Sequence, residues 1–170
     1  MAEKRSSFLL FINTASSGGS GSYALVGDGV TELSISYNAQ TNTEQYIHQD
    51  TATTTITGYQ PNAPVTAQVV KGDQAFEYIN AMRRALPIGS DANTDVVMVD
   101  VFSGGTSGAY PAIKQNVSIQ IDSYGGAASD PLSIGYTINW VGAGQEGTFN
   151  PETKTFTATS GASVASEVEV

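Results

Sequence analysis

The chain has 170 residues, enough for one domain with a buried core, and its hydrophobic fraction of 40% is typical of a globular protein. It contains no cysteine, which excludes disulfides, thiolate metal sites and cysteine nucleophiles. The formal net charge is −9, from 16 acidic and 7 basic residues. This balance argues against tight nucleic-acid binding, because phosphate contacts need clustered Lys and Arg.

Only 14% of the residues are charged, against about 25% in typical soluble domains. Ser, Thr and Gly occur 18 times each, which suits either close contact between subunits or a β-rich protein with many turns. The apolar runs are far shorter than the roughly 18 residues that span a bilayer, and Phe8–Ile12 is too short for a secretory signal. We therefore expect a protein that stays in a cytoplasm or is assembled there, without a membrane.

Strand patterns occupy most of the chain. Large apolar and small polar residues alternate through Leu132–Trp140, as in a half-buried strand, whereas Asp95–Phe102 is almost continuously apolar and predicts a strand buried on both faces. In chain order the predicted strands are Phe8–Asn13, Tyr23–Gly27, Leu33–Asn38, Thr53–Thr57, Val65–Val69, Asp95–Phe102, Asn116–Asp122, Leu132–Trp140 and Thr155–Ala158.

A single helix interrupts the strands. Asp73 can cap its N-terminus, and Ala75, Ile79, Met82 and Leu86 follow at helical spacing. Two arginines fall in the last predicted turn, where cations suit the helix dipole, and a proline and a glycine then end the pattern. We expect the apolar stripe to pack on a sheet.

The organisation predicted is one domain over residues 1–158 and a flexible tail over 159–170, rich in Ser, Ala and Glu. Ala39–Asp50 is polar and lies between strand patterns, so it predicts a long unpaired loop. The fold class is mainly β, an antiparallel sandwich or barrel flanked by one α-helix.

Motifs for chemistry are weak. Gly142–Gly147 matches the dinucleotide pattern G-x-G-x-x-G, but no helix pattern follows to hold a pyrophosphate, so we interpret it as a glycine-rich turn. His48, the one histidine, sits in the long polar segment without a nucleophile motif nearby. Acid pairs for glycoside hydrolysis could be drawn from Asp95, Asp100, Asp122 and Glu146 on composition alone. We expect no catalytic, metal or cofactor site, and no enzyme.

Eight tyrosines leave another function open. Exposed aromatic side chains gathered on one face of a β-sandwich would suit a carbohydrate-binding module. However, Tyr37 and Tyr136 fall on the apolar side of their predicted strands, so we expect them in the core.

Several segments together resemble the tail tube proteins of long-tailed phages that infect Gram-positive hosts, over roughly residues 8 to 158. The segments resemble, in chain order, the family's opening strand and turn, the stretch before the helix, the start of the helix, and the closing hairpin. They are Tyr23–Leu33; Gln45–His48 with Ile56–Pro61; Val70–Ile79; and Tyr136–Gly142 with Gly147–Phe149.

This resemblance implies a β-sandwich with one helix that forms hexameric rings, stacked into a non-contractile, siphovirus-like tail tube through which the genome is ejected. The implied partners are further copies of the chain, a tape-measure protein, tail terminator and baseplate proteins, and DNA in transient passage. The implied location is the virion tail, assembled in the host cytoplasm.

Two sets of residues are candidates for these roles. The long loop would contact the next ring, and the polar sides of two strands, which lack Lys and Arg, would line the lumen without retarding DNA. The loop set is Glu44, Tyr46, Ile47, His48 and Asp50; the lumen set is Asn116, Ser118, Gln120, Asp122, Ser133, Thr137 and Asn139.

Three alternatives stay open at this stage. The same architecture serves the tube of contractile tails and the ring protein of type VI secretion, whose tubes have a sheath outside them. A carbohydrate-binding β-sandwich would show the same strand alternation with one wet face.

Overall fold

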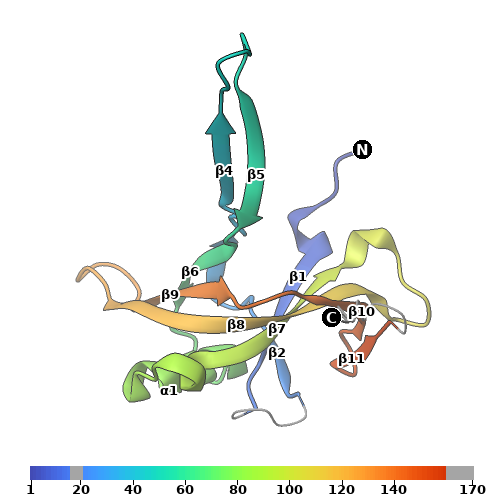
Figure 1. Cartoon of the computed structure of the whole chain (residues 1–170). Coiled ribbons are helices and arrows are strands. Elements are labelled where there is room, and N and C mark those ends of the chain that lie inside the picture. Colours follow the sequence, from blue (N-terminus) through green and yellow to red (C-terminus); the bar gives the residue numbers. More distant parts are fainter. Residues whose placement is uncertain (16–20, 160–170) are drawn as a thin grey trace.

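The computed structural model describes residues 1–15 and 21–159, so the predicted tail from residue 160 onward lies outside the described residues. Besides three short 3₁₀ helices at Arg5–Ser7, Gly89–Ala92 and Val101–Ser103, the described part contains one α-helix and eleven strands (Figure 1). They are β1 (Phe8–Asn13), β2 (Tyr23–Leu25), β3 (Val30–Leu33), β4 (Ala39–Glu44), β5 (Thr53–Tyr59), β6 (Asn62–Gln68), α1 (Gln74–Ala85), β7 (Asn93–Asp100), β8 (Tyr110–Gly125), β9 (Ser133–Trp140), β10 (Gln145–Asn150) and β11 (Thr155–Ala158).

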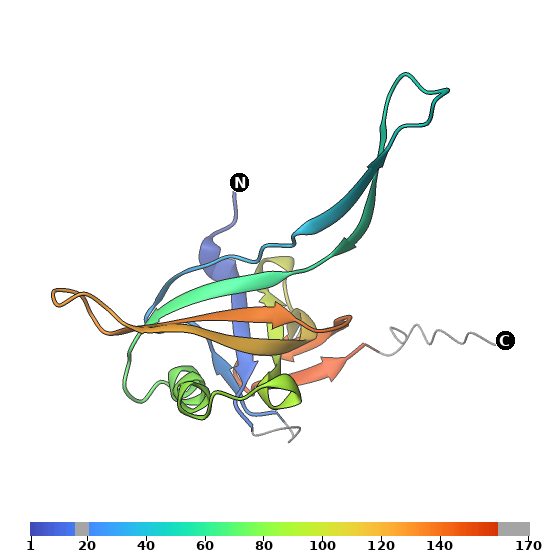
Figure 2. The same ribbon diagram turned by 60° about the vertical axis from the view of Figure 1, so that its left-hand side comes forward.

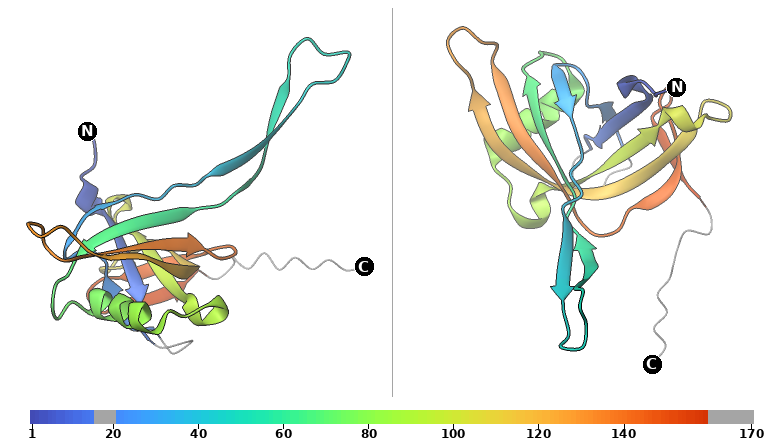
Figure 3. Two further views of the ribbon diagram at one scale, coloured as in Figure 1. Left: turned by 90° about the vertical axis from the view of Figure 1, so that its left-hand side faces the viewer. Right: turned by 90° about the horizontal axis from the view of Figure 1, so that it is seen from above.

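The main sheet is antiparallel, with the strand order β2-β1-β7-β8-β9-β6-β3. β8 is 16 residues long and is shared: its first part pairs with β10 and its later part with β9 along the same edge. The sheet curls strongly, so that it forms a half-barrel with α1 along one side (Figures 1 and 3). The predicted fold class, mainly β with one flanking helix, is confirmed.

The helix forms where the sequence predicts it. The Asp73 carboxylate accepts the backbone N–H of Phe76 at 3.1 Å, which caps the first turn. Leu86, expected in the apolar stripe, does not pack on the sheet: it ends the helix in a left-handed conformation with φ 47° and is 65% exposed. The buried face of α1, formed by Ala75, Phe76, Ile79 and Met82, packs into the larger of two hydrophobic clusters, together with side chains from β1, β6, β8 and β9.

The smaller cluster lies on the opposite face of the sheet, under the β10–β11 hairpin. Phe149 of β10 is fully buried there, its ring 4.7 Å from that of Phe11 and 5.6 Å from that of Tyr23. This packing holds the β10–β11 hairpin against β1 and β7.

Three predictions differ from the structure near the projecting hairpin. The strand predicted at Leu33–Asn38 is wrong: β3 ends at Leu33, and only Ser36 makes an isolated bridge, to Asn62. Asn38 then turns the chain away with φ 45°, so Tyr37, expected in the core, is 59% exposed. The segment 39–50 is also not an unpaired loop throughout, because its first half is β4.

β4 could not be predicted from the sequence because both of its faces are exposed to solvent. All six of its residues are exposed, so its side chains do not alternate in hydrophobicity. What holds it is the ladder to β5 and polar cross-strand pairs, such as the 2.9 Å hydrogen bond between the hydroxyls of Thr43 and Thr54.

Candidate functional site: a polar strand face and a projecting hairpin

The strand residues expected on the polar side do share one face of β8 and β9. Between them along each strand, Val117, Ile119, Ile134 and Ile138 point the other way into the helix-covered core. The register places polar residues side by side across the strands. Asn116, Ser118, Gln120, Asp122, Ser133, Thr137 and Asn139 are all exposed or partly exposed.

A hydrogen-bonded chain runs across this face. At a bulge in β8, the Asp122 carboxylate accepts the Gln120 amide and the Thr137 hydroxyl, each at 2.6 Å. The Gln120 oxygen accepts the Asn139 amide at 3.4 Å. These contacts connect the two strands through side chains and leave a carboxylate at the surface.

The polar face continues over β6, which the sequence prediction did not include. By register, Asn62, Pro64, Thr66 and Gln68 lie beside the outward residues of β9, while the alanines and the valine between them are buried. The alternation of polar and apolar residues along β6 could have indicated that its polar residues belong to this face.

The face carries no base over β6, β9 and the later part of β8. The one basic residue of β8, Lys114, lies in its first part, with Nζ 6.0 Å from the centroid of the Phe156 ring of β11. The surface formed by β6, β9 and the later part of β8 therefore carries polar side chains, and the only charges on it are negative.

The second feature is the β4–β5 hairpin, which stands away from the sheet in every view (Figures 1, 2 and 3). The five residues expected in the contact loop all lie at or next to its tip and are exposed: Glu44, Tyr46, Ile47, His48 and Asp50. This placement brings the loop set together and separates it from the polar strand face.

The tip combines an ordered polar cluster with an unprotected apolar side chain. The Tyr46 hydroxyl donates to Glu44 at 2.8 Å and the Asn42 amide donates at 2.9 Å, and these hydrogen bonds lower the pKa of the Glu44 carboxyl. The Tyr46 ring stacks on that of His48 with centroids 6.1 Å apart. Ile47 is fully exposed.

Two glycines of the G-x-G-x-x-G motif, Gly144 and Gly147, allow close packing, whereas Gly142 adopts a φ of 70° in the turn. A side chain at Gly144 would come within 2.8 Å of Ile113, and one at Gly147 would run into the Thr157 carbonyl and the Phe156 ring. The turn leads into β10 and not into a helix, as the sequence predicted. The neighbouring Gln115 side chain is buried and donates to the carbonyls of residues 116, 141 and 142, which anchors this turn.

Of the acidic residues considered for chemistry, Asp95 has structural partners within the chain. Both carboxylate oxygens of Asp95 are engaged, by the Asn13 amide at 2.8 Å and the Tyr23 hydroxyl at 2.6 Å. Burial, and then this carboxylate, raise the pKa of Tyr23. Within residues 1–15 and 21–159, no three His, Asp or Glu side chains gather as a metal site, and no helix is long and apolar enough to cross a membrane.

Three of the four exposed tyrosines lie on or beside the β4–β5 hairpin, and the fourth lies at the end of β8. Tyr46 is at the hairpin tip, whereas Tyr37 and Tyr59 are at its base. Tyr124, at the end of β8, has the Arg83 guanidinium of α1 3.9 Å above its ring. Tyr136 is buried, as expected.

No protein-family model matches this sequence, and no curated protein does. A chain from the tail of an empty GTA particle, computed with helical refinement and C6 symmetry, matches with a TM-score of 0.60 at 16% identity, over 92% of this chain and 100% of that one. A chain from the six-fold symmetrised baseplate of the anti-feeding prophage gives a TM-score of 0.48 at 7% identity, over 86% of this chain and 94% of that one. A chain from the structure of the PVC sheath/tube terminator of an extracellular contractile injection system gives a TM-score of 0.44 at 13% identity, over 86% of this chain and 96% of that one. This protein therefore shares its fold with a chain of the GTA tail.

Proposed function

We propose that this protein is the subunit of a tail tube: six copies close into a ring, rings stack, and the genome passes through the lumen into the host. The observation that carries the proposal is the polar face of β6, β9 and the later part of β8, which carries no basic residue and lies opposite the helix-covered core. Its role is structural and not catalytic. The fold shared with a chain of a C6-symmetric tail supports the same arrangement.

The chemistry of the polar face suits a DNA conduit. Each Lys or Arg that neutralises a phosphate adds affinity through counterion release, so a wall with such residues would retard a moving duplex. Hydroxyls and amides that are hydrogen-bonded to each other offer few free donors to phosphate. With Asp122 turned to the lumen, six copies would place a ring of carboxylates around the DNA, which repels it from the wall.

Ring closure would also cover exposed strand edges. β2 and β3 end the sheet order, and a free edge invites pairing with other chains. Sheets joined around a six-fold axis would use such edges for assembly.

The β4–β5 hairpin is the proposed contact between rings. A pair of strands with every β4 residue exposed is marginal alone in water, and it gains a partner if the next ring receives it. The proposal includes a non-contractile tail in the virion, assembled in the host cytoplasm, with tape-measure, terminator and baseplate proteins as partners.

Sedimentation of a hairpin-shortened variant tests the stacking role. Replacing residues 45–52 by Asn-Gly closes the two strands at the Glu44–Thr53 pair without changing their register, so the circular dichroism spectrum and the unfolding midpoint should match the wild type. We expect the wild type to form species larger than a hexamer as concentration rises, and the variant to stop at single rings. Wild-type-like polymers from the variant would contradict the assignment of the hairpin.

A further inference from the structure

A polar groove lies where the β4–β5 hairpin joins the sheet. Its volume is about 670 Å³, within the range of about 300–1,000 Å³ found for binding pockets. Five of the nine described residues that line it carry a side-chain amide, two are aromatic, and none of the nine is charged. The five amide residues are Asn38, Gln40, Gln60, Asn62 and Asn139.

Three of these amides are held by hydrogen bonds that use their nitrogens. The Asn38 amide donates to the Gln60 carbonyl at 3.0 Å, and the Gln40 amide donates to the Asn38 carbonyl at 3.0 Å. The Asn139 amide donates to the Gln120 side chain at 3.4 Å. In the part of the chain that the structure describes, the side-chain oxygens of these three residues accept no hydrogen bond, so they are available to a ligand.

The other two amides supply donors. The Asn62 side-chain oxygen accepts from Asn38 at 3.3 Å, which leaves its nitrogen for a ligand. Gln60 contributes only its backbone to this network, so its side chain offers both a donor and an acceptor. The groove therefore presents donors and acceptors together, on residues whose positions the network fixes.

The two aromatic residues stand at strand ends beside the amides. Tyr59, the last residue of β5, is 57% exposed. Trp140, the last residue of β9, packs partly on the larger hydrophobic cluster, and its backbone N–H donates to the Pro61 carbonyl at 3.1 Å. One aromatic ring is thus open to a ligand, and the other is anchored in the wall.

These groups favour a neutral ligand that carries many hydroxyls. A charged ligand would lose its water without meeting an opposite charge, and an apolar ligand would leave the amides without partners. A sugar hydroxyl both donates and accepts, as a carboxamide does. The C–H face of a sugar ring is apolar and packs well on an aromatic side chain.

We propose that this groove binds a neutral saccharide. The side chains of Gln60 and Asn62 donate to its hydroxyls, and the free amide oxygens of the other three residues accept from them. The Tyr59 ring packs on the C–H face of one sugar ring. The inference goes beyond the proposed tail tube and concerns the single chain, so it does not depend on assembly.

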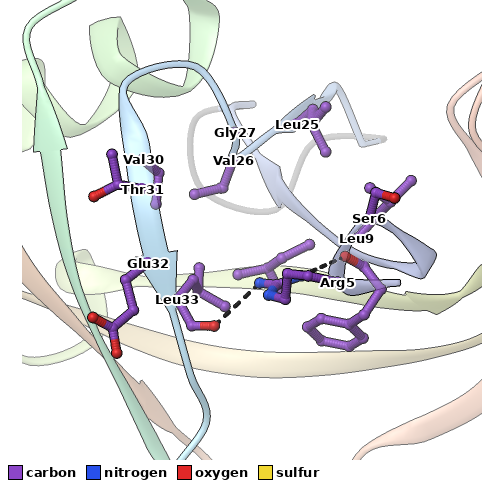
Figure 4. Close-up of a pocket in the computed structure, with 12 residues that line it drawn as sticks. Arg5, Ser6, Leu9, Leu25, Val26, Gly27, Val30, Thr31, Glu32 and Leu33 are labelled. Atoms are coloured by element: carbon purple, nitrogen blue, oxygen red, sulfur yellow. Dashed lines mark hydrogen bonds between the residues drawn. The ribbon is translucent and has the colours of Figure 1, made fainter. Parts of the chain in front are cut away.

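The recess between β1 and β3 has a different chemistry (Figure 4). Apolar side chains, Leu25 among them, line it together with the charged Arg5 and Glu32. Arg5 donates to the Phe8 carbonyl at 2.8 Å and to the Leu33 carbonyl at 3.1 Å, so its guanidinium is engaged within the chain. None of the described residues that line this recess is Asn or Gln, which makes it the comparison site for the experiment.

Intrinsic fluorescence tests the proposal, because Trp140 is the one tryptophan of the chain and lines the groove. The wild-type protein is titrated with maltotriose, cellotriose and N-acetylated chitotriose. We expect a saturable change in emission with at least one of them, with a Kd below about 10 mM. No saturable change with any of the three would overturn the proposal, and so would tighter binding of adenosine, which would assign the groove to a flat nucleobase.

Matched variants locate the binding. Y59A should weaken it about tenfold, because it removes the ring on which the sugar packs. Y46A removes a tyrosine of the same hairpin that is equally exposed, at 56%, but lies at the tip, and L25A changes the comparison site; both should bind as the wild type does. An equal loss in Y59A and Y46A would contradict the assignment. Sugar binding by a chain that never forms rings would leave this inference intact and overturn the tail tube, whereas tubes without sugar binding would do the reverse.

Discussion

The Phe149→Ala substitution tests whether the β10–β11 hairpin is held to the sheet by the smaller hydrophobic cluster. Phe149 is fully buried, with the rings of Phe11 and Tyr23 against it at centroid distances of 4.7 Å and 5.6 Å. Removing a buried phenyl ring costs about 3–5 kcal/mol through lost burial and the cavity that remains. For a chain of this length, that corresponds to a fall in Tm of about 6–20 °C.

Urea unfolding followed by circular dichroism measures this cost, at a dilution where the protein is monomeric, because assembly would raise the apparent stability. Phe102→Ala is the matched control: Phe102 is 54% exposed in the short helix after β7, so its loss should change the free energy of unfolding by less than about 0.5 kcal/mol. A loss below about 1 kcal/mol for Phe149→Ala would refute the packing argument.

Three further predictions concern the cap, the buried tyrosine and the polar face. Asp73→Ala should lower the free energy of unfolding by about 1 kcal/mol in urea unfolding, because it removes the helix cap. The raised pKa of Tyr23 means that only the unfolded chain loses this proton as the pH rises above about 10, so stability should fall there. Tyr23→Phe should weaken that fall in a pH series and Tyr37→Phe should not. Thr137→Lys should fold normally but make assembled protein retain duplex DNA, with a retention that salt abolishes; unchanged retention would contradict the proposed lumen position.

Predictions from the sequence succeed where local chemistry and packing agree. The helix could be predicted because a cap, an apolar stripe and stop residues all indicate the same segment. β9 could be predicted because large apolar residues that enter the core alternate with small or polar residues on its partly exposed face.

The failures have a common physical cause: the structure of each segment depends on a pairing or packing partner that its own sequence pattern does not reveal. The alternation of Leu33–Asn38 continues past the end of β3, but Tyr37 finds no core to enter, because the chain has already left the sheet. β4 is a strand only because β5 pairs with it. β10 begins in a glycine-rich segment, and its pairing with both β8 and β11 has no local signature.

The candidate site could be predicted only in part, because it depends on how the strands pair. Alternation identifies the outward residues of β8 and β9, but the register that joins Gln120 to Thr137, and the bulge that brings Asp122 to both, require the folded sheet.

Electron microscopy of the purified protein over a range of concentrations tests the central claim most directly. The account predicts end-on class averages with a hollow centre and six-fold symmetry at low concentration, and tubes of stacked rings at high concentration. Compact particles of single-chain mass at every concentration, without a central pore, would contradict the proposal that this chain builds a tail tube.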